Sequence, residues 1–374
     1  MSMKREIAFQ SASEIRHVVK QWLVGKISSV DLGLPEYDDR LEQWRVALLA
    51  QHNGREAIGE VRVDGVKVVF STDLRIAEKR SKQIPVDKRL KKQSIEFAPV
   101  SSRIILGDSS VVLEDYPPNS VQLVFTSPPY FNAKPEYYES EGYVGYLKTL
   151  RDIFQKCHDV LAEGRFLVVN TSPVLIRRAN RQVASRRLPI TYDLHPILDK
   201  IGFEFVDDII WQKPEGAGWH LGRGRRFAAD RQPLQYKPVT VTENIVVYRR
   251  KTPRLIDWNI RNHPYQEAIP ESLIGDGYER TNIWKIHPAH HKEHPAVFPS
   301  ALAQRVIEYY SFIGDMVLDP FAGIGTTGIV AAKTGRRFFL IEKDERYFNI
   351  MKRDASIKTH KPHISDFEYF ASTW

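Results

Sequence analysis

The chain has 374 residues, a formal net charge of +8 and one cysteine, Cys157. A single cysteine excludes a disulfide framework and a cysteine-based zinc site, and no run is long and apolar enough for a membrane span or a signal peptide. We therefore expect a cytoplasmic protein with enough material for two domains, and its positive charge suits a polyanionic partner.

Residues 1–95 have the patterns of a separate, small α+β domain. Helical periodicity covers 15–24 and 41–49, and the pattern of 61–70, with Asp64-Gly65 between apolar residues, predicts a hairpin. The stretch 75–92 is rich in lysine and arginine, so we expect a linker or an exposed helix there. These patterns predict an N-terminal accessory domain.

Strands and helices alternate from residue 96 to about residue 360. Short apolar runs predict strands, and apolar residues spaced by three and four predict helices. The expected strands are 104–106, 121–125, 166–169, 203–211, 245–248, 316–319 and 338–341, and the expected helices are 144–161, 190–201, 299–310 and 327–333. The alternation predicts the α/β class, with a doubly wound, mostly parallel sheet, followed by a C-terminal tail at 361–374.

The apolar run 121–125 ends abruptly in Thr126-Ser127-Pro128-Pro129-Tyr130. The two prolines cannot donate to a β-ladder, so the chain must leave the sheet at Ser127. The resulting loop is poor in hydrogen-bond donors, and it offers the Ser127 hydroxyl and backbone carbonyls beside the Tyr130 ring. Acceptors next to an aromatic plane suit an amino group on a flat ring. The alternative is a simple strand stop with a packed tyrosine.

A second motif lies where the strand 316–319 runs into Pro320-Phe321-Ala322-Gly323-Ile324-Gly325-Thr326-Thr327-Gly328 and a helix. The glycines allow a ligand to approach the backbone, and Glu342, at the end of the next strand, can accept both hydroxyls of a ribose. A carboxylate at Asp319 repels a pyrophosphate and attracts an ammonium or sulfonium group. The charges therefore favour S-adenosylmethionine over a nicotinamide dinucleotide. Ordinary tight packing between strand and helix is the alternative.

In this order along the chain, the two motifs resemble those of the amino-directed DNA methyltransferases, which methylate an exocyclic nitrogen of cytosine or adenine. The serine-containing loop precedes the cofactor motif, which resembles the beta arrangement, a circular permutation of the usual order. The resemblance extends from Ser101 to Lys358, and its other segments are 107–108, 209–214, 243–248, 282–286 and 294–299. It implies a permuted S-adenosylmethionine-dependent methyltransferase fold for the catalytic domain 96–360.

The resemblance also implies roles for individual residues. Ser127 and the Pro128 carbonyl would hold the target amino group, Pro129 completes the motif, and Tyr130 would stack on a flipped base. Two acceptors on the amino group would aim its lone pair at the methyl carbon, so the expected transfer is a direct in-line displacement. The residues implied in cofactor binding are Asp108, Thr126, Phe298, Pro299, Asp319, Pro320, Phe321, Gly323, Gly325, Thr326, Thr327 and Glu342.

Arginine-rich loops follow two of the expected strands. Their arginines suit contacts with the phosphates or bases of duplex DNA, and a solvated charged loop is the alternative. They are Arg177, Arg178, Arg181, Arg186, Arg187, Arg223, Arg225 and Arg226. We expect DNA-recognition insertions near 172–190, 214–240 and 251–285, with residues 1–95 sharing this task.

We interpret the chain as a sequence-specific DNA methyltransferase that acts on cytosine N4, because Ser127 stands where adenine-N6 enzymes mostly carry aspartate or asparagine. Adenine-N6 methylation is the alternative, and a non-catalytic DNA-binding module is the second. We expect S-adenosylmethionine as cofactor, duplex DNA and a cognate restriction endonuclease as partners, and no membrane association. His287, His290, His291 and His294 lack suitable partners at a fixed helical spacing, so we expect no metal site. The sequence does not indicate an oligomeric state.

Overall fold

The computed structural model describes residues 12–27, 30–50, 57–83, 96–98, 100–131, 142–176, 180, 182, 185–215, 231–234, 238, 240–289, 297–353 and 367–371. The chain divides into two compact units, Met1–Lys92 and Gln93–Trp374. Each unit has its own hydrophobic core.

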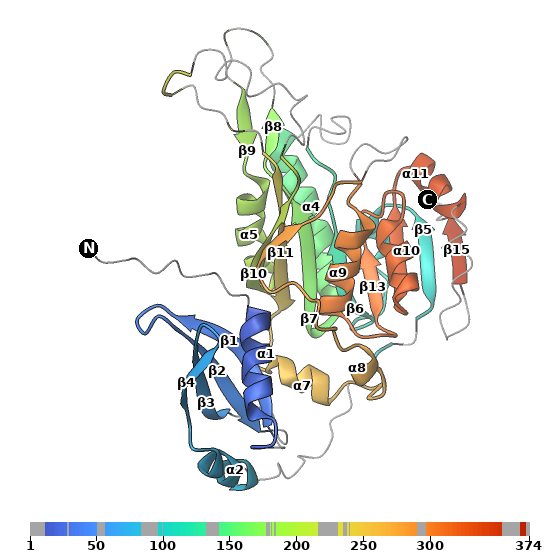
Figure 1. Cartoon of the computed structure of the whole chain (residues 1–374). Helices are drawn as coiled ribbons and strands as arrows, with labels where there is room; N and C mark the ends of the chain where they lie inside the picture. The colour runs from blue at the N-terminus through green and yellow to red at the C-terminus, as the bar shows by residue number, and fades with distance from the viewer. Residues whose placement is uncertain are drawn as a thin grey trace. The chain divides into compact units, whose positions relative to one another are not determined.

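The N-terminal unit is an antiparallel sheet with a helix packed against it (Figure 1). Its elements are α1 (Ala12–Leu23), β1 (Val30–Asp38), β2 (Gln43–Ala50), β3 (Ala57–Asp64), β4 (Lys67–Ser71) and α2 (Leu74–Gln83), with the strands in the order β1-β2-β3-β4. Ile15, Val19 and Leu23 are buried, because their spacing places them on one face of α1. The helix expected at 15–24 and the hairpin expected at 61–70 are confirmed.

The helix expected at 41–49 is wrong, because this segment forms β2. Val46, Leu48 and Ala50 are buried, and a buried residue at every second position belongs to a strand. The neighbouring strand β1 pairs antiparallel with β2 and has no counterpart among the expected elements. The basic stretch 75–92 begins within α2, and its part after residue 83 lies outside the described residues.

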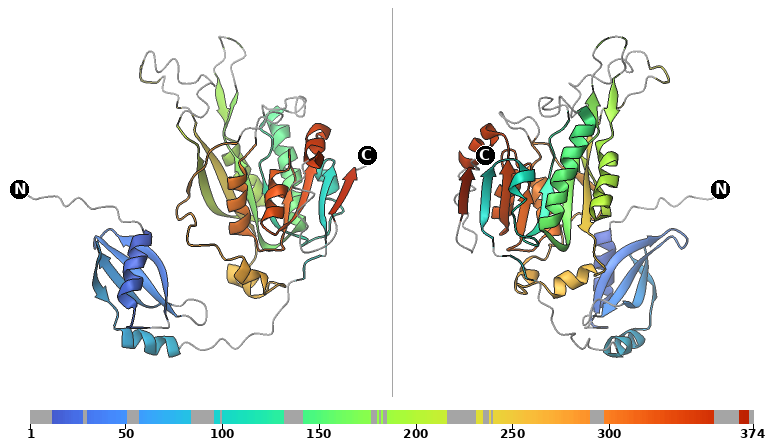
Figure 2. Two further views of the ribbon diagram at one scale, coloured as in Figure 1. Left: turned by 45° about the vertical axis from the view of Figure 1, so that its right-hand side comes forward. Right: turned by 180° about the vertical axis from the view of Figure 1, so that it is seen from behind.

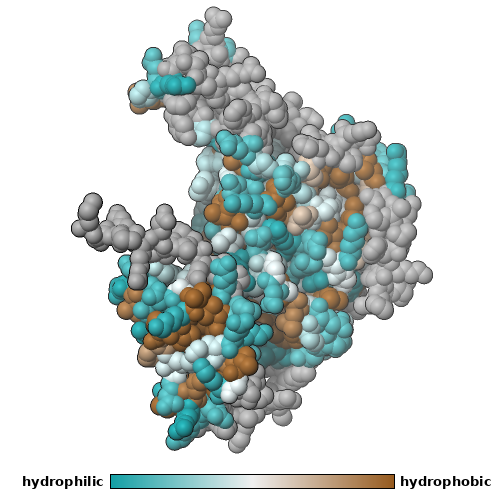
Figure 3. Space-filling view, in the orientation of Figure 1, coloured by the Kyte–Doolittle hydropathy of each residue, from teal (hydrophilic) through white to brown (hydrophobic). Residues whose placement is uncertain are grey.

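The N-terminal unit exposes both apolar and charged side chains. Hydrophobic atoms gather on the face of this unit that is visible in Figure 3. The exposed large apolar residues of the unit are Val24, Leu34, Tyr37, Leu41, Val66, Val69, Phe70 and Ile76. On the sheet, Arg45 and Arg62 both form ion pairs with Glu60. These charges alternate along β2 and β3 with the buried valines, so this face of the sheet is a solvated surface.

The second unit is built on a sheet that has nine strands in the described part of the chain, in the order β12-β10-β11-β7-β6-β13-β14-β5-β15 (Figure 2). The strands are β5 (Ser102–Leu106), β6 (Val121–Thr126), β7 (Leu161–Thr171), β10 (Phe203–Gln212), β11 (Thr242–Arg250), β12 (Ile283–Lys285), β13 (Met316–Asp319), β14 (Arg337–Glu342) and β15 (Phe367–Ala371). β11 runs antiparallel to β10 and β7, and the other neighbours pair in parallel. β8 (Val174–Ile176) and β9 (Arg186–Leu188) form a separate antiparallel pair.

Helices cover both faces of this sheet. The helices of the unit are α3 (Ser109–Val112), α4 (Gly142–Val160), α5 (Ile190–Ile201), α7 (Ile256–Arg261), α8 (Ala268–Glu271), α9 (Ser300–Tyr310), α10 (Thr326–Lys333) and α11 (Glu345–Arg353). α9, α10 and α11 share one core with Phe125 and Leu340, whereas α4 and α5 share another with Val124 and Phe339. Successive residues of a strand point to opposite faces, so adjacent residues enter different cores. The doubly wound, mostly parallel α/β class expected from the sequence is confirmed.

Every strand and helix expected between residues 104 and 341 is present, with ends that differ by up to a few residues. Elements without an expected counterpart are α3, β8, β9, α7, α8, β12, α11 and β15. All of these except α11 have six residues or fewer, and β12 and β15 are the two outermost strands of the sheet. Among the described residues, no helix has the length and apolar character needed to cross a membrane.

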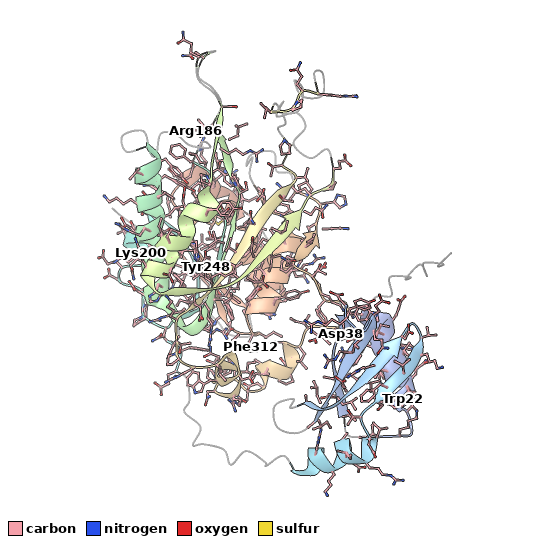
Figure 4. All side chains as sticks on the ribbon, turned by 90° about the vertical axis from the view of Figure 1, so that its left-hand side faces the viewer. Trp22, Asp38, Arg186, Lys200, Tyr248 and Phe312 are labelled. Carbon is pink, nitrogen blue, oxygen red and sulfur yellow. The ribbon has the colours of Figure 1, made fainter. Side chains whose placement is uncertain are left out.

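The two edges of the parallel strands carry different structures. β6, β13, β14 and β5 all point the same way, so their carboxyl ends meet at one edge, called here the carboxyl edge. The β8–β9 hairpin projects at this edge, whereas α7 and α8 lie at the opposite, amino edge (Figures 1 and 2). Figure 4 shows Arg186 of the hairpin and Phe312, before β13, at opposite ends of the unit. In folds of this class, ligands bind at the carboxyl edge.

Candidate active site

Four parallel strands bring the predicted site residues to the carboxyl edge. β6, β13, β14 and β5 are consecutive neighbours in the sheet, and they end at or just before Ser127, Asp319, Glu342 and Asp108. Residues more than 200 positions apart are in direct contact here, since the Ser109 hydroxyl donates to the Pro320 carbonyl at 2.5 Å. The segment that follows β5 and the glycine turn therefore lie side by side at this edge.

Asp319 is a buried carboxylate at the end of β13. Its two oxygens accept hydrogen bonds of 2.6 Å from the hydroxyls of Thr126 and Thr327. A third bond of 3.0 Å comes from the backbone N–H of Phe321. Burial raises the pKa of Asp319 to about 6, and these hydrogen bonds oppose the rise. Thr126, which directly precedes the serine loop, thus ties that loop to the glycine turn.

The glycine turn after Asp319 has the conformation that its sequence requires. Gly323 and Gly325 have φ values of +55° and +87°, in the left-handed region that residues with a side chain rarely adopt. Gly328 is needed for a different reason, because a Cβ atom there would lie 2.4 Å from Leu340 Cδ1. The turn therefore brings its backbone close to the ends of β13 and β14, and α10 starts at Thr326.

Glu342 and Asp108 lie at or just after the ends of the next two strands along the carboxyl edge, β14 and β5. Glu342 accepts backbone hydrogen bonds of 2.7 Å from Gly323 on one oxygen and from Asp344 on the other. Asp108 caps α3 by accepting from the Ser110 N–H, and it pairs with Lys343 at 2.9 Å. Burial raises the pKa of Asp108, but hydrogen bonds from Ser110 and Lys343 outweigh it, so that the net shift is downward. The edge therefore offers several carboxylate acceptors over a short span.

The aromatic and proline residues predicted in the cofactor pocket lie around the same edge. Phe298 packs against Phe125 of β6, with ring centroids 5.1 Å apart. Pro299 is buried and precedes the first turn of α9. Phe321 is half-buried against the core on the other face of the sheet.

The serine loop contacts a group of polar residues that sequence reasoning did not assign to the site. The Tyr130 hydroxyl donates to Glu243 at 3.0 Å. Asn170 Nδ2 lies 2.8 Å from the same carboxylate oxygen and 3.4 Å from Ser127 Oγ. Lys213 Nζ contacts the other oxygen of Glu243 at 2.5 Å. Burial, followed by the negative charge of Glu243, raises the pKa of Tyr130 well above its usual value.

Two of these residues, Glu243 and Lys213, could have been found from the sequence. Glu243 and Lys213 lie in segments 243–248 and 209–214, which belong to the resemblance, but neither received a role there. Asn170 follows the apolar run 166–169 at the end of β7, which is where the carboxyl edge collects polar side chains. The position of a residue at this edge is therefore the more general signal.

Two of the arginines predicted to bind DNA fall within the described residues. Arg186 is exposed on the β8–β9 hairpin. Arg187 donates hydrogen bonds to the Thr240 hydroxyl and the Pro238 carbonyl, so it links the hairpin to the chain before β11. The others, Arg177, Arg178, Arg181, Arg223, Arg225 and Arg226, lie outside the described residues.

Much of the segment 251–285, expected to read DNA sequence, packs at the amino edge. Asn259 of α7 donates to the Gly164 carbonyl at 3.0 Å, near the start of β7. His263 Nε2 lies 3.2 Å from Asp315, which directly precedes β13 and forms a buried ion pair with Arg165. These contacts place 256–272 at the end of the sheet away from Ser127, which does not favour contact with a base held there.

The other residues singled out in the sequence are the cysteine and the histidines of 287–294. Cys157 is buried within α4, and burial raises its thiol pKa. His290, His291 and His294 lie outside the described residues. Among the residues that the structure does describe, no group of three or more histidine, cysteine or acidic side chains is placed to hold a metal ion.

Comparisons with known proteins identify the family of the chain. The model of the N6/N4 methyltransferase family, described as DNA methylase, matches residues 121–353. The chain is 26% identical to the Type II methyltransferase M.BglII of Bacillus subtilis over 67% of each chain. It is 25% identical to the DNA adenine methyltransferase YhdJ of Escherichia coli over 71% of this chain and 86% of the relative.

A solved structure of similar fold also contains the cofactor predicted here. TTHA0409 of Thermus thermophilus, described as a DNA modification methylase and solved with S-adenosyl-L-methionine, has a TM-score of 0.56 and 29% identity over 73% of this chain and 99% of that chain. In our structure, the buried Asp319, the glycine turn and Glu342 supply the charge and acceptors that suit this molecule. The chain therefore belongs to the DNA methylase family and is a DNA methyltransferase that uses S-adenosyl-L-methionine.

Proposed function

We propose that this enzyme methylates the N4 amino group of cytosine in duplex DNA, as the modification enzyme of a restriction system and in the beta arrangement of its family. The observation that carries the choice of base is Ser127, which places a neutral hydroxyl at the head of the Pro-Pro-Tyr loop. Serine at this position is mostly found in cytosine-N4 enzymes of the family. The name of M.BglII as a Type II methyltransferase supports the role in restriction and modification.

The roles of the loop residues follow from the chemistry of an exocyclic amino group. Such a group is a weak nucleophile because its lone pair is delocalised into the ring. The Ser127 hydroxyl oxygen and the Pro128 carbonyl each accept one N–H, which localises the lone pair and aims it at the methyl group. Pro129 keeps the loop outside the ladder, and the Tyr130 ring stacks on the base after it leaves the duplex.

The cofactor residues divide by charge and position. S-adenosyl-L-methionine supplies an electrophilic methyl group on a sulfonium. Asp319 and the turn Pro320, Phe321, Gly323 and Gly325 hold its methionine part, and Glu342 accepts from the ribose hydroxyls. Asp108 lies at the adenine end, and Phe298 and Pro299 close the pocket. Thr126, Thr326 and Thr327 support the turn, two of them through the hydrogen bonds to Asp319.

Contacts with DNA are assigned to the surface at the carboxyl edge. Arg186 and Arg187 on the β8–β9 hairpin lie at the edge where the target base must enter. The other predicted DNA-binding arginines of 172–190 follow β8 along the chain, and those of 214–240 follow β10. Phosphate contacts of this kind position the duplex, and base contacts then select the site.

Adenine-N6 methylation is the second candidate. It is supported by the similarity to YhdJ, which is named a DNA adenine methyltransferase. Both reactions need the same in-line geometry, and they differ in whether a cytosine or an adenine ring binds at the serine loop. Digestion of methylated DNA to nucleosides, followed by mass spectrometry, distinguishes N4-methylcytosine from N6-methyladenine.

The substitution Ser127→Ala tests the assignment. It removes one acceptor from the amino group, and we expect the rate of methyl transfer from labelled S-adenosylmethionine to unmethylated DNA to fall about 100-fold. Ser120→Ala is the matched control, because Ser120 precedes β6 as Ser127 follows it and donates to Pro117 away from the site. Full activity of Ser127→Ala would remove the role of this residue, and N6-methyladenine in the wild-type digest would favour the second candidate.

A further inference from the structure

Glu243 is a buried carboxylate beside the serine loop that the scheme above does not use. It lies near the start of β11, and because β11 is antiparallel to its neighbours, this start is at the carboxyl edge. Its side chain is 11% exposed. A buried carboxylate is costly unless its charge and its acceptor sites are satisfied. The groups that satisfy it therefore indicate what it holds.

Three elements converge on this carboxylate. Lys213, which follows β10, contacts Glu243 Oε1. The Tyr130 hydroxyl of the serine loop and Asn170 Nδ2 of β7 both donate to Oε2. A carboxylate is an acceptor on both oxygens, so it can take all three bonds. An amide of the same shape offers only one acceptor atom, and a lysine cannot donate to its NH₂ group.

The carboxylate also decides how the Asn170 amide is turned. Because Glu243 accepts, Asn170 must present its NH₂ group to it, and that group is the one that faces Ser127 Oγ at 3.4 Å. Asn170 Oδ1 is buried and has no hydrogen-bond partner among the described residues. If the amide turned by half a rotation, its oxygen would face the carboxylate and the serine. Glu243 therefore selects a donor, rather than an acceptor, next to the Ser127 hydroxyl.

We propose that Glu243 is a positioning residue for methyl transfer: it fixes the Tyr130 ring through its hydroxyl and the Asn170 amide that faces Ser127, while Lys213 neutralises it. This inference rests on the proposed function of the serine loop. Two of the three residues that contact the target base in that scheme are then held by one carboxylate, Tyr130 directly and Ser127 through Asn170. The hydrogen bonds described for Glu243 go to Tyr130, Asn170 and Lys213, so we expect it to act on the base side of the site and not on cofactor binding.

The test compares the full chain carrying Glu243→Gln, Tyr130→Phe or both with wild type. Single-turnover transfer of a tritiated methyl group from S-adenosylmethionine to unmethylated plasmid DNA gives the rate, and calorimetry gives the cofactor affinity. We expect Glu243→Gln to slow transfer at least 20-fold while the cofactor Kd stays within twofold. The double variant should be no slower than Glu243→Gln alone, because both changes remove the same contact.

Glu114→Gln is the matched control. Glu114 also pairs with a lysine, Lys156, but on the exposed surface. This variant should keep the wild-type rate and affinity. Glu243→Gln at the wild-type rate would overturn the proposal, and so would rate losses that multiply in the double variant. A parallel loss of cofactor affinity would assign Glu243 to the general structure of the site.

The thermal midpoints of the same variants give a readout without DNA. Tyr130→Phe should lower the midpoint in wild type but not in Glu243→Gln, because we expect the single acceptor oxygen of the amide to take the bond from the charged Lys213 instead of the one from the hydroxyl. If wild type transfers no methyl group to DNA, the proposed function fails. The midpoints still decide whether Glu243 holds Tyr130, and equal shifts in both backgrounds would refute that contact.

Discussion

The Asp319 side chain is buried, and it must be ionised to attract the positively charged cofactor. It is 1% exposed, and three hydrogen bonds stabilise its ionised form. Even so, burial raises its pKa to about 6. A cation that binds next to it restores the favourable environment of the charge, so cofactor binding and ionisation of Asp319 are coupled.

This coupling predicts the pH dependence of cofactor affinity. Because the pKa is raised, Asp319 is increasingly protonated as the pH falls through about 6 and no longer attracts the positive charges of S-adenosylmethionine. We expect the Kd, measured by calorimetry, to be constant above pH 7 and to rise about tenfold for each unit below pH 6. Asp319→Asn should bind weakly at every pH. A wild-type Kd that is independent of pH between 5 and 8 would contradict this coupling.

At the level of the elements, the close approach of α10 to the sheet depends on Gly328. Gly328 lies in the first turns of α10, and Leu340 of β14 fills the space where its side chain would be. Leu340 is fully buried, so it has little room to move. The third glycine of this turn therefore serves packing between helix and strand, whereas the first two serve the backbone conformation.

Gly328→Ala should therefore destabilise the protein, although alanine is the better helix former. The gain in helix propensity is about 1 kcal/mol, and overpacking costs about 1–3 kcal/mol, so we expect a net loss on the order of 1 kcal/mol. Urea unfolding of the two proteins measures it. Gly277→Ala is the control, since nothing lies within 4 Å of a Cβ there, and it should be neutral. A more stable Gly328→Ala would show that α10 can shift outward.

The elements also show what the sequence could and could not predict. Strands β6 and β13 were predictable because strands buried on both faces are continuously apolar, and prolines or glycines mark where they end. The segment Gln43–Ala50 was mistaken for a helix, because a short run of small and apolar residues fits both the helical and the strand periodicity. The convergence of Asn170, Lys213 and Glu243 was not predictable, since it depends on contacts between residues 30 and 73 positions apart.

The direction of one strand explains the remaining difference. The segment 251–285 was expected at the DNA, but it follows β11, the reversed strand, so the chain leaves the sheet at the amino edge. Apolar periodicity does not reveal strand direction, because parallel and antiparallel buried strands have similar composition. The edge that a connection occupies therefore had to come from the structure.

On the scale of the whole molecule, charge and chemistry are divided between the units. The contacts described above at the active site involve only residues of Gln93–Trp374. Residues 1–92 contain 18 lysines and arginines and 13 aspartates and glutamates, so they carry +5 of the +8 total. This division supports the expectation that the N-terminal unit shares in binding DNA.

A chain of residues 93–374 tests this division. We expect it to bind S-adenosylmethionine with unchanged affinity and to bind duplex DNA about tenfold more weakly, with a smaller dependence on salt, because fewer phosphates are neutralised. Calorimetry and fluorescence anisotropy at several salt concentrations measure both. The full chain with Arg75→Ala and Lys79→Ala, both exposed on α2, keeps the N-terminal unit but lacks two of its positive charges. Its DNA affinity therefore distinguishes the effect of losing charge from the effect of losing the whole unit. Equal DNA affinity of the short and full chains would leave the N-terminal unit without this role.

The reversed strand β11 also makes one part of the enzyme exchangeable. Gln212 at the end of β10 pairs with Thr242 at the start of β11, so the chain leaves the sheet and returns to it at adjacent positions. The length and composition of residues 214–241 can therefore change while the ladder and the sheet order stay as they are. Lys213 and Glu243 stand at the two ends of this connection and are joined to each other. Because we propose that this connection contacts DNA, a connection grafted from a relative between these two residues should change the DNA sequence that the enzyme modifies.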